Sequence, residues 1–167
     1  MPVTRLNHAV LYVRNVETSA AFYCDVLGFR VVNQMPGAAF LQAGASTNDH
    51  DLGLFQIGDQ AAASGAGRST VGLYHLAWEV DTLAELSRLA NELSARGALV
   101  GATDHSTTKS LYAKDPDDIE FEVAWVVPAT LLNDELLAAR SALRPLDLPK
   151  EIEHFGAQTR GGIGVSV

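Results

Sequence analysis

The chain has 167 residues, 47% hydrophobic and 19% charged, which is the composition of a folded globular protein. A net charge of −8 without any basic cluster argues against nucleic-acid binding and against an anionic membrane surface. No stretch reaches the ~20 apolar residues of a membrane span, and the N-terminus lacks a signal-peptide pattern. The single cysteine, Cys24, is typical of a reducing compartment, so we expect a cytoplasmic protein.

The first half of the chain predicts the element order β-α-β-β-β. Leu6–Val13 is an apolar run typical of a strand, with His8 in its middle. Glu17–Leu27 has apolar residues at helical spacing, and Gly28 stands where a glycine often ends a helix. Three strand-like stretches follow: Phe29–Met35, Ala38–Gln42 and Asp51–Ile57.

The second half repeats this order after a connector, Asp59–Val71, that is rich in Ala, Gly, Ser and Thr. Leu73–Val80 is again a strand with a histidine, His75, in its middle. The stretch that follows predicts a helix at Leu83–Leu93 closed by Gly97, a strand at Ala98–Thr103 and then a hairpin.

The two histidines recur 67 residues apart at the same strand position, which indicates an internal duplication. We therefore predict an α+β fold of paired βαβββ modules forming a curved mixed sheet around a metal-binding cavity. The modules are placed at 5–58 and 72–125, within a single domain at 1–127.

The predicted hairpin, Ser110–Trp125, has an acidic turn at Asp115–Asp118. On its returning strand Glu120 and Glu122 alternate with three apolar residues: Phe121, Val123 and Trp125. A carboxylate on such a strand is costly to bury without a cation partner. We expect Glu120 on a solvated face and a metal ion as the partner of Glu122.

The pattern breaks beyond Pro128. Ala129–Leu143 predicts one amphipathic helix, and 144–167 predicts an irregular tail, so we assign 128–167 to a C-terminal helix and tail. Such a tail would cover the mouth of a site, bind a second subunit or stay unstructured. His154 in this tail is given no role.

Two equivalent histidines and Glu122 make a candidate metal site. Two imidazoles and one carboxylate form the facial triad that suits a non-haem Fe(II) with open coordination positions. The competing interpretation is three unconnected polar residues, and it leaves unexplained why all of them lie in apolar strands. Mn(II), Ni(II) and Zn(II) also accept nitrogen and oxygen ligands, so the metal is left open.

The motifs NHAVLYV, SAAFYCDVLGF, YHLAWEV and YAKDPDDIEFEV resemble the vicinal oxygen chelate superfamily. It comprises glyoxalases, bleomycin-resistance proteins, methylmalonyl-CoA epimerases and type I extradiol dioxygenases. The resemblance spans about residues 5–125. It implies paired βαβββ modules with metal ligands at His8, His75 and Glu122.

Only a few residues indicate which branch of the superfamily this chain resembles. Glyoxalases carry a fourth ligand, a glutamate on the last strand of the first module, but residues 29–58 contain no glutamate. Gln56 as a substitute ligand would suit an epimerase-like site, although at a strand end we expect it to be exposed. These features count against the glyoxalase branch.

Two segments are similar to the extradiol dioxygenases. Asn48–Leu52 resembles the segment that carries their active-site histidine, which implies that His50 is the acid/base. Ser110–Tyr112, with Glu122 ten residues beyond the tyrosine, resembles their Ser-aromatic-Tyr motif. This implies Tyr112 as a hydrogen-bond donor to a substrate oxygen. The alternatives are loop solvation for the histidine and sheet packing for the tyrosine.

The resemblance is less specific at two other positions. His105 lies seven residues before Tyr112, where a family histidine often lines the pocket, and simple solvation is the alternative. Asp118 stands where the family usually has glycine, which puts the geometry of the turn in doubt.

The extradiol resemblance implies an Fe(II)-dependent dioxygenase that cleaves a catecholic ring with O2. It also implies a role in aromatic catabolism and, as in many members, a homodimer. One alternative is a glyoxalase- or epimerase-like lyase or isomerase that uses a divalent metal without oxygen. The other is a non-catalytic resistance protein that sequesters a small molecule.

Overall fold

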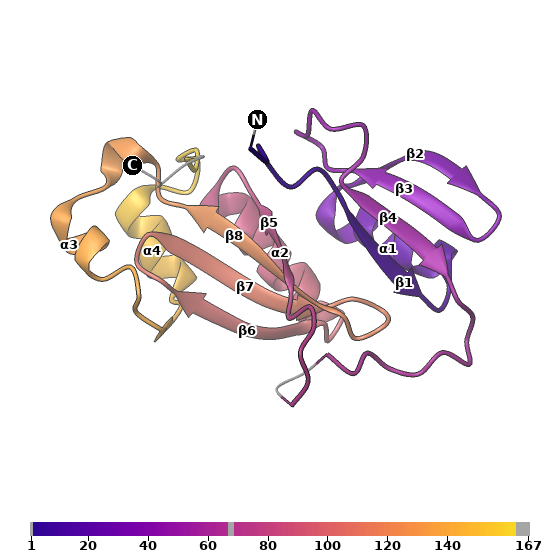
Figure 1. Cartoon of the computed structure of the whole chain (residues 1–167). Helices are drawn as coiled ribbons and strands as arrows, with labels where there is room; N and C mark the ends of the chain where they lie inside the picture. The colour runs from indigo at the N-terminus through magenta and orange to yellow at the C-terminus, as the bar shows by residue number, and fades with distance from the viewer. Residues whose placement is uncertain (1, 67–68, 163–167) are drawn as a thin grey trace. The chain divides into compact units, whose positions relative to one another are not determined.

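The computed structural model describes residues 2–66 and 69–162, so the parts of the predicted connector and tail at 67–68 and 163–167 lie outside it (Figure 1). The described residues form two compact units. The first contains the chain up to Gly65 together with the turn Asp115–Asp118, and the second contains the remainder. The α+β class and the repeated β-α-β-β-β order are confirmed.

The first unit is a four-stranded mixed sheet with one helix on one of its faces. Its strand order is β1-β4-β3-β2, and β1 runs parallel to β4 while the other pairs are antiparallel. Alternate strand side chains are buried on one face: Leu11, Val13, Leu52 and Leu54. The elements are β1 (Ala9–Val13), α1 (Val16–Leu27), β2 (Arg30–Met35), β3 (Ala38–Gln42) and β4 (Leu52–Gln56).

Helix α1 has the predicted end signals. The Asn15 side chain accepts a hydrogen bond from the Thr18 N–H at 2.8 Å, which caps the start of the helix. At the other end Gly28 adopts φ 71°, which a glycine adopts without a steric penalty, and its N–H donates to the Cys24 carbonyl. Burial raises the pKa of the Cys24 thiol, so this cysteine is not an activated nucleophile.

The second unit repeats the topology and adds one strand. Its order is β5-β8-β7-β6-β9, again with the first and last strands of the repeat, β5 and β8, in parallel. Helix α2 buries four leucines: Leu83, Leu86, Leu89 and Leu93. The elements are β5 (Leu76–Glu79), α2 (Leu83–Ala95), β6 (Leu99–Asp104), β7 (Thr108–Lys114), β8 (Glu120–Val126) and β9 (Arg144–Pro145).

Both histidine-bearing strands begin later than predicted. Strand β1 starts at Ala9 and β5 at Leu76, so His8 and His75 each directly precede a strand instead of lying in its middle. The neighbouring strand determines where each strand begins. Pairing of β1 with β4 starts at Ala9 and Leu52, and pairing of β5 with β8 starts at Leu76 and Phe121.

The predicted alternation on β8 is confirmed. Phe121, Val123 and Trp125 are at most 1% exposed, so they form part of the core. Glu120 and Glu122 point to the opposite face of the sheet and are half-buried. Strand β8 therefore presents its two glutamates on the sheet face opposite to its buried core residues.

The acidic turn is held in place by contacts inside the first unit. Asp117 accepts hydrogen bonds from the Arg14 N–H at 3.0 Å and from Arg14 Nη1 at 2.8 Å. The Tyr23 hydroxyl donates to Asp115 at 3.2 Å. The turn itself is closed by the Asp118 N–H, which donates to the Asp115 carbonyl at 3.0 Å.

Asp118 adopts φ 65°, the left-handed conformation that glycine tolerates best. At this position the turn therefore has a glycine-like backbone conformation with a residue that carries a Cβ. We expect the Asp118→Gly protein to be more stable than the Asp118→Ala protein by about 1 kcal/mol in free energy of unfolding. The reason is that alanine has a steric penalty at this φ and glycine has none. Urea unfolding of the two variants measures this difference. Equal stabilities would show that the left-handed conformation does not matter here.

The prediction of one helix over Ala129–Leu143 is wrong. The structure has a 3-10 turn, η1 (Ala129–Leu131), and a short helix, α3 (Asp134–Ala138), which precede β9. Asn133 separates them, because its extended backbone and its side-chain bond to the Leu136 N–H make it a helix cap.

The predicted irregular tail contains a further helix, α4 (Leu148–Phe155). Asp147 caps its start, and proline in the first turn is compatible with a helix. The ring of Phe155 lies 5.4 Å from that of buried Trp125, measured between ring centroids. No helix within the described residues is long and apolar enough to cross a membrane.

Candidate active site

His75 and Glu122 lie on the parallel strand pair of the second unit. His75 Nε2 is 3.1 Å from Glu122 Oε2, and the two side chains are 23% and 13% exposed. The other carboxylate oxygen accepts a hydrogen bond from the Ser110 hydroxyl on β7. Nδ1 of His75 is buried and has no hydrogen-bond partner among the described residues. The imidazole therefore makes its polar contact through Nε2.

This pair fits a divalent metal in donor type and in spacing. Histidine nitrogen and carboxylate oxygen lie about 2.0–2.2 Å from such ions, so two ligands at right angles are separated by about 3 Å. Nε2 of His75 and Oε2 of Glu122 have this separation. Among the described residues no group of three or more His, Cys, Asp or Glu side chains is arranged to hold a metal. The triad with His8 stays a prediction.

A pocket of about 380 Å³ opens on the face of the second sheet that carries Glu122. Tyr112 links the pocket to the pair, since it stands opposite Glu122 in the ladder and its ring centroid is 5.7 Å from that of His75. Such a volume suits a small-molecule ligand. The lining is partly apolar and partly polar: Tyr74, Val100, Gly101, Thr103, His105, Tyr112, Glu120 and Leu143.

Tyr112 and His105 are hydrogen-bonded to each other in this pocket. The Tyr112 hydroxyl is 3.0 Å from His105 Nε2, and His105 Nδ1 is 3.2 Å from the Ala142 carbonyl oxygen. Burial, followed by the negative charge of Glu122, raises the pKa of Tyr112. The phenol therefore keeps its proton at neutral pH.

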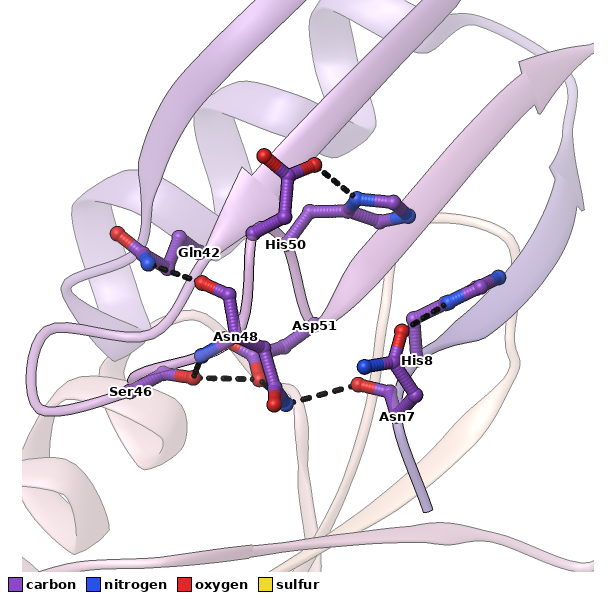
Figure 2. A network of polar contacts seen from close by, with 8 residues as sticks. Asn7, His8, Gln42, Ser46, Asn48, His50 and Asp51 are labelled. Carbon is purple, nitrogen blue, oxygen red and sulfur yellow. Dashed lines mark hydrogen bonds and ion pairs between the residues drawn. The ribbon is translucent and has the colours of Figure 1, made fainter.

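The first unit brings His8 and His50 together. Their ring centroids are 4.5 Å apart, because each precedes one of the parallel strands β1 and β4 (Figure 2). Each ring bonds through Nδ1 to its preceding neighbour, His8 to Asn7 at 2.8 Å and His50 to Asp49 at 2.9 Å. Nδ1 of each ring thus has a polar partner, and Nε2 is the nitrogen that a ligand would use.

Asp51 organises the loop that carries His50 (Figure 2). Its carboxylate accepts from the Ala43 N–H at 2.8 Å, the Ser46 hydroxyl at 2.8 Å and Asn48 Nδ2 at 2.7 Å. Asn48 Nδ2 also donates to the Asn7 carbonyl at 2.8 Å. These bonds tie the loop before β4 to the segment before β1, which places His50 beside His8.

The predicted site residues thus fall into two groups. His75, Glu122, Tyr112 and His105 lie in the second unit, and His8 and His50 lie in the first. Gln56 is exposed, as expected, and its Oε1 accepts from the N–H of Val16 at the start of α1.

Two contacts of the site were not predicted from the sequence. The Ser110 bond to Glu122 has a signal, because Ser110 and Tyr112 alternate onto the same sheet face. The contact between His105 and the Ala142 carbonyl has no sequence signal, because every residue has a backbone carbonyl.

Residues 5–123 match the sequence profile described as Glyoxalase/Bleomycin resistance protein/Dioxygenase superfamily. A catechol-2,3-dioxygenase of Bacillus subtilis (strain 168) is 32% identical over 114 residues, which are 68% of this chain and 39% of that protein. Biphenyl-2,3-diol 1,2-dioxygenase 3 of Rhodococcus globerulus is 34% identical over 124 residues, 70% of this chain and 61% of that protein. The chain therefore spans less than two thirds of either relative.

Among solved structures, the chain resembles a glyoxylase/bleomycin resistance protein/dioxygenase domain from Frankia sp. EAN1pec. The TM-score is 0.61 at 19% identity, covering 77% of this chain and 96% of that domain, so the likeness concerns the fold. The superfamily resemblance of the sequence motifs is confirmed, and the two curated relatives bear the dioxygenase names expected for the extradiol branch. This chain belongs to the Glyoxalase/Bleomycin resistance protein/Dioxygenase superfamily.

Proposed function

We propose that this chain is a metal-dependent extradiol-type dioxygenase that cleaves the ring of a catechol-like substrate with O2. The observation that carries the proposal is the His75–Glu122 pair, 3.1 Å apart, beside a pocket that contains Tyr112 and His105. The names of the two curated relatives support the same reaction class.

The proposed metal ligands are His75, Glu122 and His8, and the proposed native metal is Fe(II). The equivalent places of the two histidines, each directly before the first strand of a βαβββ repeat, support the third ligand. When bound, such an ion supplies open coordination positions for the substrate oxygens and for O2.

The pocket residues suit an aromatic diol. Val100 and Leu143 are 52% and 80% exposed, so they offer apolar surface to a ring. Tyr112 presents its hydroxyl to a substrate oxygen. His50, beside the proposed ligand His8, is the acid/base that takes a proton from the substrate and returns one during ring opening.

His50→Ala is expected to lower kcat for catechol cleavage about 100-fold, which is the usual contribution of a positioned acid or base. The matched control is His154→Ala, since His154 is exposed on α4 and far along the chain from the site residues. Metal content is measured for both variants, so that loss of metal is distinguished from loss of proton transfer. Wild-type turnover by a fully loaded His50→Ala protein would exclude this role.

The decisive experiment measures metal content after anaerobic purification, then oxygen uptake by the Fe(II)-loaded protein with catechol and biphenyl-2,3-diol. Oxygen uptake with a yellow ring-opened product is the expected result. Bound metal without uptake would favour the lyase or isomerase alternative. A protein that binds no metal would contradict the proposed ligand set. Light scattering during gel filtration tests the homodimer that we also propose.

A further inference from the structure

A second cavity lies on the face of the second sheet opposite to Glu122. Its volume is about 230 Å³, and its lining residues come from β6, β7, β9, α3 and α4. Lys109 lines this cavity and Tyr112 lines the pocket beside Glu122. Since the two residues are an odd number of positions apart on β7, their side chains leave opposite faces of the sheet. The cavity is therefore separate from the candidate active site.

The cavity is positively charged, although the chain as a whole carries −8. Three cations and two carboxylates line it, so the net charge of these side chains is +1: Lys109, Arg144, Lys150, Asp104 and Glu151. Arg144 Nε lies 3.4 Å from Asp104 Oδ2, but the guanidinium makes no hydrogen bond among the described residues. The Lys150 ammonium has no partner in this part of the chain either. Both cations can therefore donate to an anion in the cavity.

The third cation, Lys109, is buried, with a side chain only 3% exposed. Its ammonium lies 2.5 Å from Asp104 Oδ1 and 2.9 Å from Glu151 Oε2. An ammonium has three N–H donors, so one of them has no acceptor within the described residues. A buried donor without an acceptor is costly, and an anion bound in the cavity would supply the missing acceptor.

The charge and the walls of the cavity favour one class of anion. A single negative charge balances the net charge of the lining, whereas a phosphate dianion exceeds it and is repelled by the two carboxylates. The planar fork of the Arg144 guanidinium matches the two oxygens of a carboxylate. Leu136 and the ring of Phe155 add apolar wall, which suits an apolar body attached to that carboxylate.

We propose that this cavity is a binding site for a small organic monocarboxylate. The carboxylate contacts Arg144, Lys150 and the remaining N–H donor of Lys109, and the apolar body contacts Phe155. Because the lining joins β6, β7 and β9 to α4, the bound carboxylate links the C-terminal helix to the sheet and stabilises the folded chain. The site requires neither the metal nor a catechol.

Titration of the full-length protein with benzoate, followed by amide NMR, tests the site. We expect saturable shifts at Lys109, Lys150 and Phe155, and weaker binding of both inorganic phosphate and uncharged benzyl alcohol. Benzoate shifts confined to Gly101 and Tyr112 would place the ligand in the other pocket and overturn the proposal. Tighter binding of phosphate, equal binding of benzyl alcohol or the absence of benzoate binding would also overturn it.

Variants separate a specific site from general attraction to positive charge. Arg144→Gln and Lys150→Gln should each weaken benzoate binding about 10-fold, because each removes charge-assisted hydrogen bonds. Lys150 has no partner to lose among the described residues, so its variant keeps the fold. The matched control is Arg160→Gln, since Arg160 lies outside the cavity and its Nη2 is 3.6 Å from Asp81.

The control should bind benzoate like the wild type. An equal loss in Arg160→Gln and Arg144→Gln, or wild-type affinity in both cavity variants, would overturn the proposal. These measurements use no catechol and no oxygen, so failure of the proposed dioxygenase reaction leaves their result unchanged.

Discussion

Glu122→Gln is expected to weaken divalent-metal binding by at least about 100-fold and to abolish catechol cleavage. Removal of a residue that merely orients a ligand lowers metal affinity 10–100-fold, and loss of a ligand itself should exceed this. The amide keeps the shape of the side chain but loses its negative charge and has only one oxygen that can bind the metal beside His75. Metal affinity is measured by competition with a chelator at fixed pH.

Glu120→Gln is the matched control for metal affinity. Glu120 lies two residues earlier on the same strand and the same half-buried face, so both variants remove one charge from one region. We expect the control to keep wild-type metal affinity. Equal losses in the two variants would attribute metal binding to general negative charge and would exclude Glu122 as a specific ligand.

The parts of this fold that local rules determine were predictable. The alternation on β8 placed the core residues and Glu122 on opposite faces, because side chains of a strand alternate. Gly28 marked the end of α1, because a left-handed residue closes many helices. The repeated position of the two histidines predicted the duplication that both sheets show.

The features that local rules missed depend on partners distant in the sequence. His8 and His75 precede their strands because the ladder partners set where pairing begins. The Asn133 cap divides a segment whose apolar spacing predicted one helix. The hydrogen bond between His105 and the Ala142 carbonyl could not be predicted, because every residue type has the same backbone carbonyl.

The second large effect is expected at a cluster of charged side chains that joins the sheet to α4: Asp104, Lys109 and Glu151. Lys109 on β7 has a side chain only 3% exposed. Its ammonium lies 2.5 Å from Asp104 Oδ1 and 2.9 Å from Glu151 Oε2, and 5.5 Å from the ring centroid of Phe155. Lys109 therefore joins β6 and β7 to the C-terminal helix.

Lys109→Met is expected to lower the free energy of unfolding by about 3 kcal/mol. Methionine fills much of the same volume but removes the ammonium from both carboxylates, so that Asp104 keeps only its ion pair with Arg144 at 3.4 Å. Breaking a buried pair in this way typically costs 3–5 kcal/mol. The lower end applies because the side chains of Asp104 and Glu151 are each 14% exposed and keep some hydration. Urea unfolding at neutral pH measures the change.

The pH dependence gives an independent check of this mechanism. Burial alone would raise the pKa of Asp104, but hydrogen bonds from Lys109 and the Ser106 N–H, with the charges of Lys109 and Arg144, lower it overall. A carboxyl whose pKa is lower in the folded state stabilises above its unfolded pKa, and this contribution is lost as pH falls through the folded pKa. Lys109→Met should therefore lose less stability on acidification than the wild type.

Two control proteins distinguish the effect of leaving a buried charge unpaired from the effect of removing any positive charge. Arg88→Met removes the exposed partner of Glu85 on α2 and should change stability by less than about 1 kcal/mol. The triple variant Lys109→Met, Asp104→Asn, Glu151→Gln should recover much of the loss, because no unpaired carboxylate remains. If Lys109→Met alone unfolds with wild-type stability, the carboxylates are solvated without it, and the cluster does not fix α4 to the sheet.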